Sequence, residues 1–132
     1  MSRAAPMRTG DEHPHKGRTG LSRILHAARH SADGFAEAWR NEAAFRQELL
    51  LAAVLIPLAF VLDAPGIGKA LMIGSVVLVL IVELLNSAVE AAIDRISFER
   101  HPLAKRAKDI GSAAVLLSLV NVAIVWGLVL FG

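Results

Sequence analysis

The chain has 132 residues, of which 55% are hydrophobic and 20% are charged, and its formal net charge at pH 7 is +2. This length corresponds to one domain, and the long uncharged runs described below predict an all-α integral membrane protein. Cysteine is absent, which excludes disulfide bonds, thiol chemistry and cysteine-based metal sites.

Residues 1–20 predict a disordered cytoplasmic tail, because they are rich in Gly, Pro, Arg, His and Thr. They contain no apolar stretch of the kind found in a signal peptide, so we expect the helices themselves to direct membrane insertion. His13 and His15 could hold a metal ion loosely, although a solvated tail is the better explanation.

Residues 21–40 predict an amphipathic surface helix. The apolar side chains lie within about 100° of arc; they are Leu21, Ile24, Leu25, Ala28, Ala32, Phe35 and Trp39. The opposite side carries Arg23, His26, Arg29, His30, Asp33, Glu37 and Arg40. A basic amphipathic helix beside a membrane span is typical of the membrane surface. The alternative is a helix packed on other protein, and Gly34 could divide it in two.

Three apolar runs predict three transmembrane helices, at about residues 43–62, 69–97 and 109–131. The uncharged part of the first run, residues 49–62, would extend only ~21 Å as a helix, short of the ~30 Å hydrocarbon core. We therefore expect this span to begin near Ala43, with Pro57 as a possible kink. Residues 63–68 predict a turn and residues 95–108 a polar loop broken at Pro102.

The basic residues predict the topology. Eight Lys and Arg lie in residues 1–48, one is Lys69, and five lie in residues 95–108. The positive-inside rule then places the N-terminus and the second connection in the cytoplasm and the C-terminus outside.

The central polar segment is Glu83-Leu-Leu-Asn-Ser-Ala-Val-Glu-Ala-Ala-Ile-Asp94. On a helix, all of its polar side chains share one face about 100° wide. A carboxylate at membrane depth costs at least ~2.5 kcal/mol, so these groups should face protein, water, metal or substrate. The alternative is a soluble helix with a solvated acidic face, which the apolar flanking sequence disfavours.

The polar residues near the cytoplasmic side suggest a type of chemistry. Carboxylates from two helices could hold a divalent cation such as Mg²⁺, and Lys108 and Arg23 could hold phosphate oxygens. A carboxylate in an apolar zone could act as a general base on a lipid hydroxyl. Common nucleotide motifs are missing, since the segment around Gly66 and Lys69 lacks the spacing of a P-loop. The residues alone therefore indicate an intramembrane acidic site facing the cytoplasm.

Three blocks of sequence resemble the bacterial integral-membrane diacylglycerol kinases. They are the polar segment from Glu83 to Asp94, Trp39-Arg-Asn-Glu-Ala-Ala-Phe-Arg-Gln-Glu48 and Arg106-Ala-Lys-Asp-Ile-Gly-Ser-Ala-Ala-Val115. The resemblance covers residues 21–132. It implies a homotrimer of three-span subunits with an N-terminal surface helix and active sites shared between subunits. It also implies transfer of the γ-phosphate of Mg-ATP to diacylglycerol, giving phosphatidic acid, with no nucleic-acid partner.

The resemblance also implies roles for individual residues. Glu83 would be the general base, supported by Asn86, and Glu42 and Glu90 would bind the metal. ATP would contact Arg23, His30, Glu42, Glu90, Glu99, His101, Lys108 and Asp109. The lipid would contact Ala44, Phe45, Arg46, Gln47, Glu48, Glu83, Ser112 and Trp126.

Some positions depart from the family or have a simpler explanation. The tail has no counterpart, His30 replaces a tyrosine, and the loop of residues 98–105 differs in composition. Asp94 could simply pair with Arg95 or Arg106. Asp109 could be a charge at a helix N-terminus, and Trp126 an interfacial residue.

Three other functions stay open from the sequence. An undecaprenol kinase of the same fold is the nearest. A small oligomeric transporter could use Glu83 as a proton or cation site. In a helical scaffold, the polar face would only fix packing between subunits.

Overall fold

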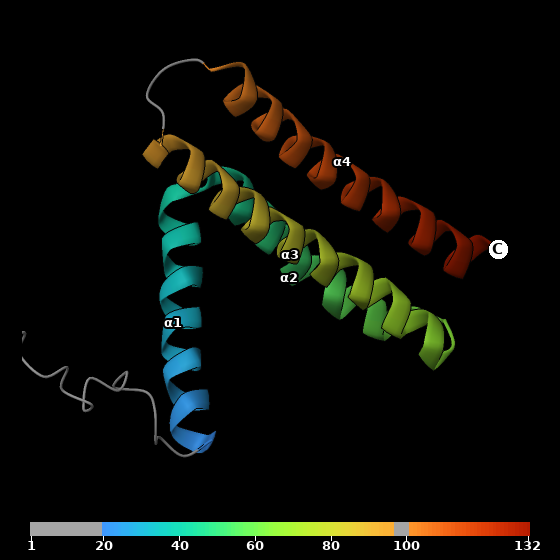
Figure 1. Cartoon of the computed structure of the whole chain (residues 1–132). Helices are drawn as coiled ribbons and strands as arrows, with labels where there is room; N and C mark the ends of the chain where they lie inside the picture. The colour runs from blue at the N-terminus through green and yellow to red at the C-terminus, as the bar shows by residue number, and fades with distance from the viewer. Residues whose placement is uncertain (1–19, 97–100) are drawn as a thin grey trace, which may run out of the picture. The chain divides into compact units, whose positions relative to one another are not determined.

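The computed structural model describes residues 20–96 and 101–132, which are almost entirely helical (Figure 1). The helices are α1 (Gly20–Asn41), α2 (Ala43–Val61), α3 (Gly66–Ile96) and α4 (Pro102–Phe131). The predicted all-α class is confirmed. Most of the predicted tail, residues 1–19, and the predicted ATP contact Glu99 lie outside the described residues.

Helices α2, α3 and α4 are each long and apolar enough to cross a membrane, with 19, 31 and 30 residues. At 1.5 Å per residue they extend about 28, 46 and 45 Å, which is near or above the thickness of a hydrocarbon core. The three predicted spans are therefore confirmed as helices, and they fit a bacterial membrane protein.

Two of these helices begin earlier than the sequence predicted. Helix α3 begins at Gly66 rather than Lys69, and α4 begins at Pro102 rather than Asp109. Proline suits the first position of a helix, because the N–H it lacks would have no partner there. The side chain of His101 caps the same end, since its Nδ1 accepts a hydrogen bond from the backbone N–H of Leu103 (3.1 Å). Much of the predicted polar loop is therefore the first two turns of α4.

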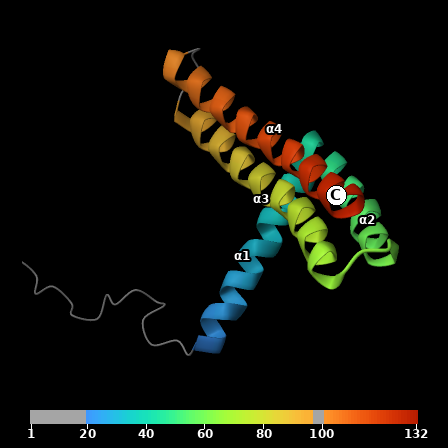
Figure 2. The same cartoon turned by 90° about the vertical axis from the view of Figure 1, so that its right-hand side faces the viewer.

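Helix α3 packs against both α2 and α4, and α4 runs beside it in both views (Figures 1 and 2). Its buried residues recur every three or four positions, as expected for one face of a helix. They are Gly68, Met72, Ser75, Val76, Val79 and Glu83. The apolar stripe that holds the bundle together thus ends on a carboxyl group.

The far end of the α3–α4 contact is fixed by close packing. The Trp126 indole N–H donates a hydrogen bond to the carbonyl oxygen of Met72 (3.2 Å). A Cβ added at Gly68 would lie only 2.7 Å from Cγ1 of Val129, so glycine allows this close approach. These contacts set the register in which the other ends of the two helices meet.

Many large apolar side chains of the three spans are exposed on the single chain. On α4 they include Leu116, Leu117, Leu128 and Phe131. Only 6% of an 18-residue apolar stretch of this helix is buried within the chain. Apolar surface on this scale needs lipid or other protein to cover it. This supports the assignment of α4 as a membrane-spanning helix.

The chain forms two compact units, which divide between Ala36 and Glu37. In the N-terminal unit, α1 is helical through Gly34, so the predicted division of this helix there is wrong. The Ser31 hydroxyl donates a hydrogen bond to the carbonyl oxygen of Ala27 (2.8 Å). The helix predicted over residues 21–40 is therefore present and continuous.

The junction between α1 and α2 is held by Arg46. Glu42 has extended backbone angles, φ −118° and ψ 104°, which interrupt the helix. Nη1 of Arg46 donates hydrogen bonds to the carbonyl oxygens of Trp39 (2.7 Å) and Arg40 (3.2 Å). A guanidinium group on the last carbonyls of a helix satisfies acceptors that would otherwise have no partner. The Glu42 side chain itself makes no capping hydrogen bond to α2.

Replacing Arg46 with methionine should destabilise this junction. Arg46→Met keeps an unbranched apolar stem but removes both hydrogen bonds, so we expect the free energy of unfolding to fall by about 1–2 kcal/mol. Unfolding of the purified protein by SDS in mixed micelles would measure this change. Arg40→Met is the matched control, because the Arg40 side chain forms only an exposed ion pair with Glu37 (3.4 Å) within residues 20–96 and 101–132. Equal stability of the two variants would contradict this structural role.

Candidate active site

Glu83 is the centre of the candidate site. Its side chain belongs to the buried stripe of α3, and the residue is only 4% exposed. The carboxyl groups of Glu83 and of Glu48, on α2, lie within hydrogen-bond range of each other. Two carboxyl groups can form such a bond only when they share a proton, because an ionised carboxylate has no donor. The sequence did not predict this pairing.

Among the described residues, three buried side-chain oxygens of α2 and α3, one of them on Glu48 itself, have no hydrogen-bond partner. They are Oε2 of Glu48, Oδ1 of Asn86 and Oγ of Ser87. A proton shared with Glu83 would give the Glu48 carboxyl group one partner. Buried polar atoms are nearly always hydrogen-bonded in native proteins. Such a group of unpaired atoms therefore indicates a place where a ligand, water or another subunit supplies the missing partners.

Two further carboxylates contribute to the site. The charges of Glu42, between α1 and α2, and of Glu90, two turns after Glu83, both act on the Glu83 carboxyl group. Like charges collected in this way favour either protonation of one carboxyl group or the binding of a cation. Within residues 20–96 and 101–132, no group of three or more His, Asp or Glu side chains is placed to hold a metal ion. A metal ion here would need oxygens from a ligand as well as from the protein.

Positive charge enters the site from α4. The Lys108 ammonium group is 2.8 Å from Oδ1 of Asp94 on α3, and Glu90 is a second negative neighbour. Asp94 is therefore in an ion pair, as its simpler explanation allowed, but its partner is Lys108 rather than Arg95 or Arg106. Once α4 begins at Pro102, it is Lys108 that lies beside the last turns of α3.

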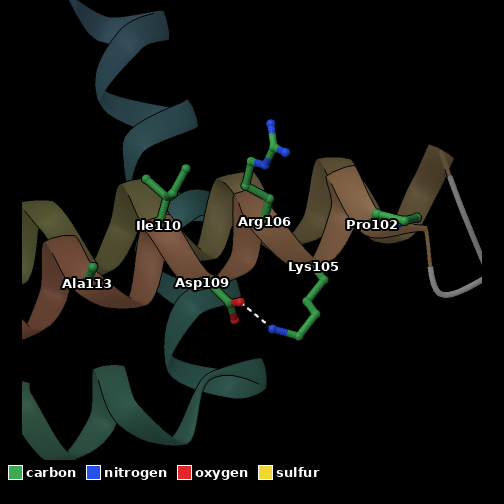
Figure 3. A pocket seen from close by; sticks show the side chains of 6 residues that line it. All are labelled: Pro102, Lys105, Arg106, Asp109, Ile110 and Ala113. Atoms are coloured by element: carbon green, nitrogen blue, oxygen red, sulfur yellow. Dashed lines mark hydrogen bonds and ion pairs between the residues drawn. The ribbon is translucent and has the colours of Figure 1, made fainter.

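Asp109 forms an ion pair within α4. Its Oδ2 is 2.6 Å from Nζ of Lys105, one turn earlier. Figure 3 shows both side chains on one side of α4, with Arg106 projecting to the other. They border a shallow pocket of about 350 Å³ lined by Pro102, Lys105, Arg106, Asp109, Ile110 and Ala113. Lys105 was not predicted as a site residue, although its spacing of four from Asp109 is a recognisable helical pair.

Asn86 reaches α4 because residue 111 is a glycine. A Cβ added at Gly111 would overlap Oδ1 of Asn86 and lie 3.2 Å from its Cγ. The Asn86 amide is thus held directly against the α4 backbone, one turn beyond Lys108. Asn86, Glu90 and Asp94 lie at intervals of four residues and therefore on one face of α3. This face runs along α4 from Gly111, which contacts Asn86, to Lys108, which pairs with Asp94.

The other predicted ATP contacts have different surroundings. Arg23 and His30 are exposed in the N-terminal unit. His101 uses Nδ1 to cap α4, which leaves Nε2 for a ligand. Its ring borders an apolar pocket of about 360 Å³, which is lined by Ile93, Ile96, His101, Leu103 and Ala104.

The predicted lipid contacts are also scattered. Phe45 is in the core at 1% exposure, and Arg46 holds the α1–α2 junction. Ala44, Gln47 and Ser112 are exposed. Trp126, on α4, is hydrogen-bonded to Met72 of α3. Met72 precedes Glu83 by eleven residues, or about 16 Å along the helix, so Trp126 lies far from the Glu83 end of the bundle. Of this set, Glu48 is the residue that contacts Glu83.

Comparison with known proteins gives one consistent family. The model of the family described as prokaryotic diacylglycerol kinase matches residues 29–130. The chain is 56% identical to the diacylglycerol kinase of Pseudomonas aeruginosa over 119 residues, which are 90% of this chain and 97% of that protein. It is 52% identical to that of Haemophilus influenzae and 50% identical to that of Escherichia coli K12, each over 113 residues. These residues are 86% of this chain and 96% and 93% of the respective relatives. The chain therefore belongs to the prokaryotic diacylglycerol kinase family.

Proposed function

We propose that this protein is an ATP-dependent diacylglycerol kinase, which transfers the γ-phosphate of ATP to the hydroxyl group of diacylglycerol and gives phosphatidic acid. The names of its relatives support this activity. The observation that carries the proposal is the buried carboxyl group of Glu83, paired with Glu48 inside a membrane-spanning bundle. A diacylglycerol hydroxyl can reach that depth from the lipid without leaving the membrane.

The Glu48–Glu83 pair suits a general base. When the shared proton rests on Glu48, Glu83 is the free carboxylate and Glu48 orients it by donating a hydrogen bond. The lipid hydroxyl oxygen attacks the γ-phosphorus while the bond to the bridging oxygen of ADP breaks, and the hydroxyl proton passes to Glu83. Phosphoryl transfer needs mainly positioning and neutralisation of charge, and Lys108 supplies one positive charge for the phosphates.

Glu42 and Glu90 would hold Mg²⁺ together with phosphate oxygens of ATP. Carboxylate oxygens suit this ion, and the two residues converge on Glu83 from different parts of the chain. Bound there, the ion would neutralise phosphate charge. The apolar pocket beside His101 is suited to a purine base, with Asp109, Arg23, His30 and Glu99 as further ATP contacts.

The lipid contacts and the assembly belong to the same proposal. We place Ala44, Phe45, Arg46, Gln47, Glu48, Ser112 and Trp126 along the lipid path. A homotrimer would cover the exposed apolar surface of α4 and could bring the scattered residues together across subunits. In the inner membrane, α1 would lie on the cytoplasmic surface, and the C-terminus would be outside.

A lipid kinase assay tests the proposal. The purified protein in mixed micelles should convert diacylglycerol to phosphatidic acid with Mg-ATP, and phosphorus NMR would identify the product. Undecaprenol offered in the same micelles is the control substrate. Equal or faster phosphorylation of undecaprenol would overturn the assignment of diacylglycerol, and phosphorylation of neither lipid would overturn the kinase.

Replacing Gly111 with alanine tests the placement of Asn86. The added methyl group needs the space of the Asn86 amide, so the side chain must turn away from the site. We expect kcat to fall about tenfold, since small displacements at a reacting centre are costly. Stability should be kept, because alanine favours the helix and the clash is with the end of a side chain.

The matched control is Gly74→Ala on α3, where an added Cβ has no atom within 4 Å. Its kcat should equal that of the wild type in the same assay. A Gly111→Ala variant with unchanged kcat would show that Asn86 is not required in its present position.

A further inference from the structure

The ion pair between Asp94 and Lys108 joins the C-terminal end of α3 to the N-terminal part of α4. The two side chains are 65% and 44% exposed, and their charged atoms are 2.8 Å apart. Ion pairs with this much exposure contribute little to folding stability, because water and salt screen the charges. A contribution to folding stability therefore does not account for this ion pair.

A second carboxylate of α3 acts on Lys108 through its charge. Glu90 is one turn before Asp94 on the same face of α3, and its charge also acts on the Lys108 ammonium group. Asp94 forms the hydrogen bond, while Glu90 acts only through its charge. Among the described residues, the contact with Asp94 thus decides which α3 carboxylate holds the lysine.

We propose that Asp94 is a positioning residue that keeps Lys108 away from Glu90. The inference rests on the proposed function, in which Glu90 binds Mg²⁺ and Lys108 binds phosphate. Without Asp94, the ammonium group would turn toward Glu90 and form an ion pair there. That pair would occupy an oxygen needed by the metal and a cation needed by the phosphates.

The same geometry lets Lys108 leave Asp94 when ATP arrives. An exposed ion pair exchanges easily, and a triphosphate offers more negative charge than one carboxylate. Asp94 follows Glu83 by eleven residues, or about 16 Å along the helix, so it acts through Lys108 rather than on the reacting atoms. Its effect should therefore appear in Mg-ATP binding and leave phosphoryl transfer at saturation nearly unchanged.

The test compares Asp94→Asn with the wild-type protein in mixed micelles. We expect the KM for Mg-ATP to rise about threefold to fivefold, the size that a partly exposed ion pair supports, with kcat changed less than about twofold. The Mg²⁺ concentration for half-maximal rate should rise in parallel. Asp94→Glu should restore both values toward wild type, because it returns the carboxylate.

Glu37→Gln is the matched control, since it removes an exposed carboxylate whose side-chain partners are Arg40 and Asn41, neither of which is assigned to the site. Equilibrium binding of a non-hydrolysable Mg-ATP analogue gives a readout that does not depend on the lipid. An unchanged KM and analogue affinity in Asp94→Asn would overturn the role of Asp94 while leaving the kinase intact. A fall in kcat and thermal stability without a change in KM would overturn it in favour of a structural role. A wild-type protein that neither binds the analogue nor phosphorylates lipid would overturn the proposed function itself.

Discussion

Glu83→Gln should lower kcat by roughly 10² to 10⁴-fold, the contribution usual for a general acid or base. Glutamine has nearly the same shape, so the buried stripe of α3 should pack as before around the 4%-exposed side chain. It cannot accept the hydroxyl proton, however, and the bond with Glu48 becomes an ordinary amide–carboxyl contact. The affinity for a non-hydrolysable Mg-ATP analogue should stay within about twofold of wild type, since Glu42, Glu90 and Lys108 are unchanged.

Two comparisons make this result specific. Glu83→Asp keeps the carboxylate but shortens the side chain, so it should retain part of the activity that glutamine loses. Glu37→Gln, an exposed substitution of the same kind, should have full activity. Normal turnover in Glu83→Gln would remove the general base from the mechanism, and a large loss of analogue binding would reassign Glu83 to the nucleotide site.

The spans could be predicted from the sequence because uncharged runs of this length have few alternatives. Where they begin was less predictable. Gly66 and Pro102 were interpreted as turn and loop residues, yet both lie at the first position of a helix. The Pro102 error mattered more, because it left Lys105 and Lys108 in a loop and hid the pairing of Lys108 with Asp94 on α3.

The acidic face of α3 was predictable for a different reason. Helical periodicity alone places Glu83, Asn86 and Glu90 on one side of a helix. The contacts between helices were not predictable in this way, because they depend on the register of α2 and α4 against α3. That register is set by packing details such as the Trp126 hydrogen bond to Met72 and the close approach at Gly68.

Two contacts illustrate this limit. The resemblance assigned Glu48 to the lipid and did not indicate that its carboxyl group lies in hydrogen-bond range of Glu83. Arg95 and Arg106 were considered as partners of Asp94, which pairs with Lys108 instead. In both cases the residue was recognised as polar and near the site, while its partner depended on tertiary structure.

Glu90→Gln should affect the nucleotide rather than the proton. Glu90 is partly buried, and its charge acts on both Glu83 and Lys108, so it lies between the proposed base and the proposed phosphate-binding lysine. Removing a carboxylate that binds the metal should lower kcat/KM for Mg-ATP by about 10²-fold, mostly through KM, and raise the Mg²⁺ concentration needed. Steady-state rates at varied Mg²⁺ and varied ATP would separate these effects.

The same variant separates the roles of Glu90 and Asp94. In the proposal, Asp94 acts by keeping Lys108 away from Glu90. Glutamine at position 90 has no charge to attract the ammonium group. Adding Asp94→Asn to Glu90→Gln should therefore cause almost no further loss of affinity for the analogue. Two independent contributions would instead add in free energy. Binding of the Mg-ATP analogue to both single variants and the double variant gives the coupling directly. Full additivity would mean that Asp94 and Glu90 act separately, even if each lowers Mg-ATP affinity on its own.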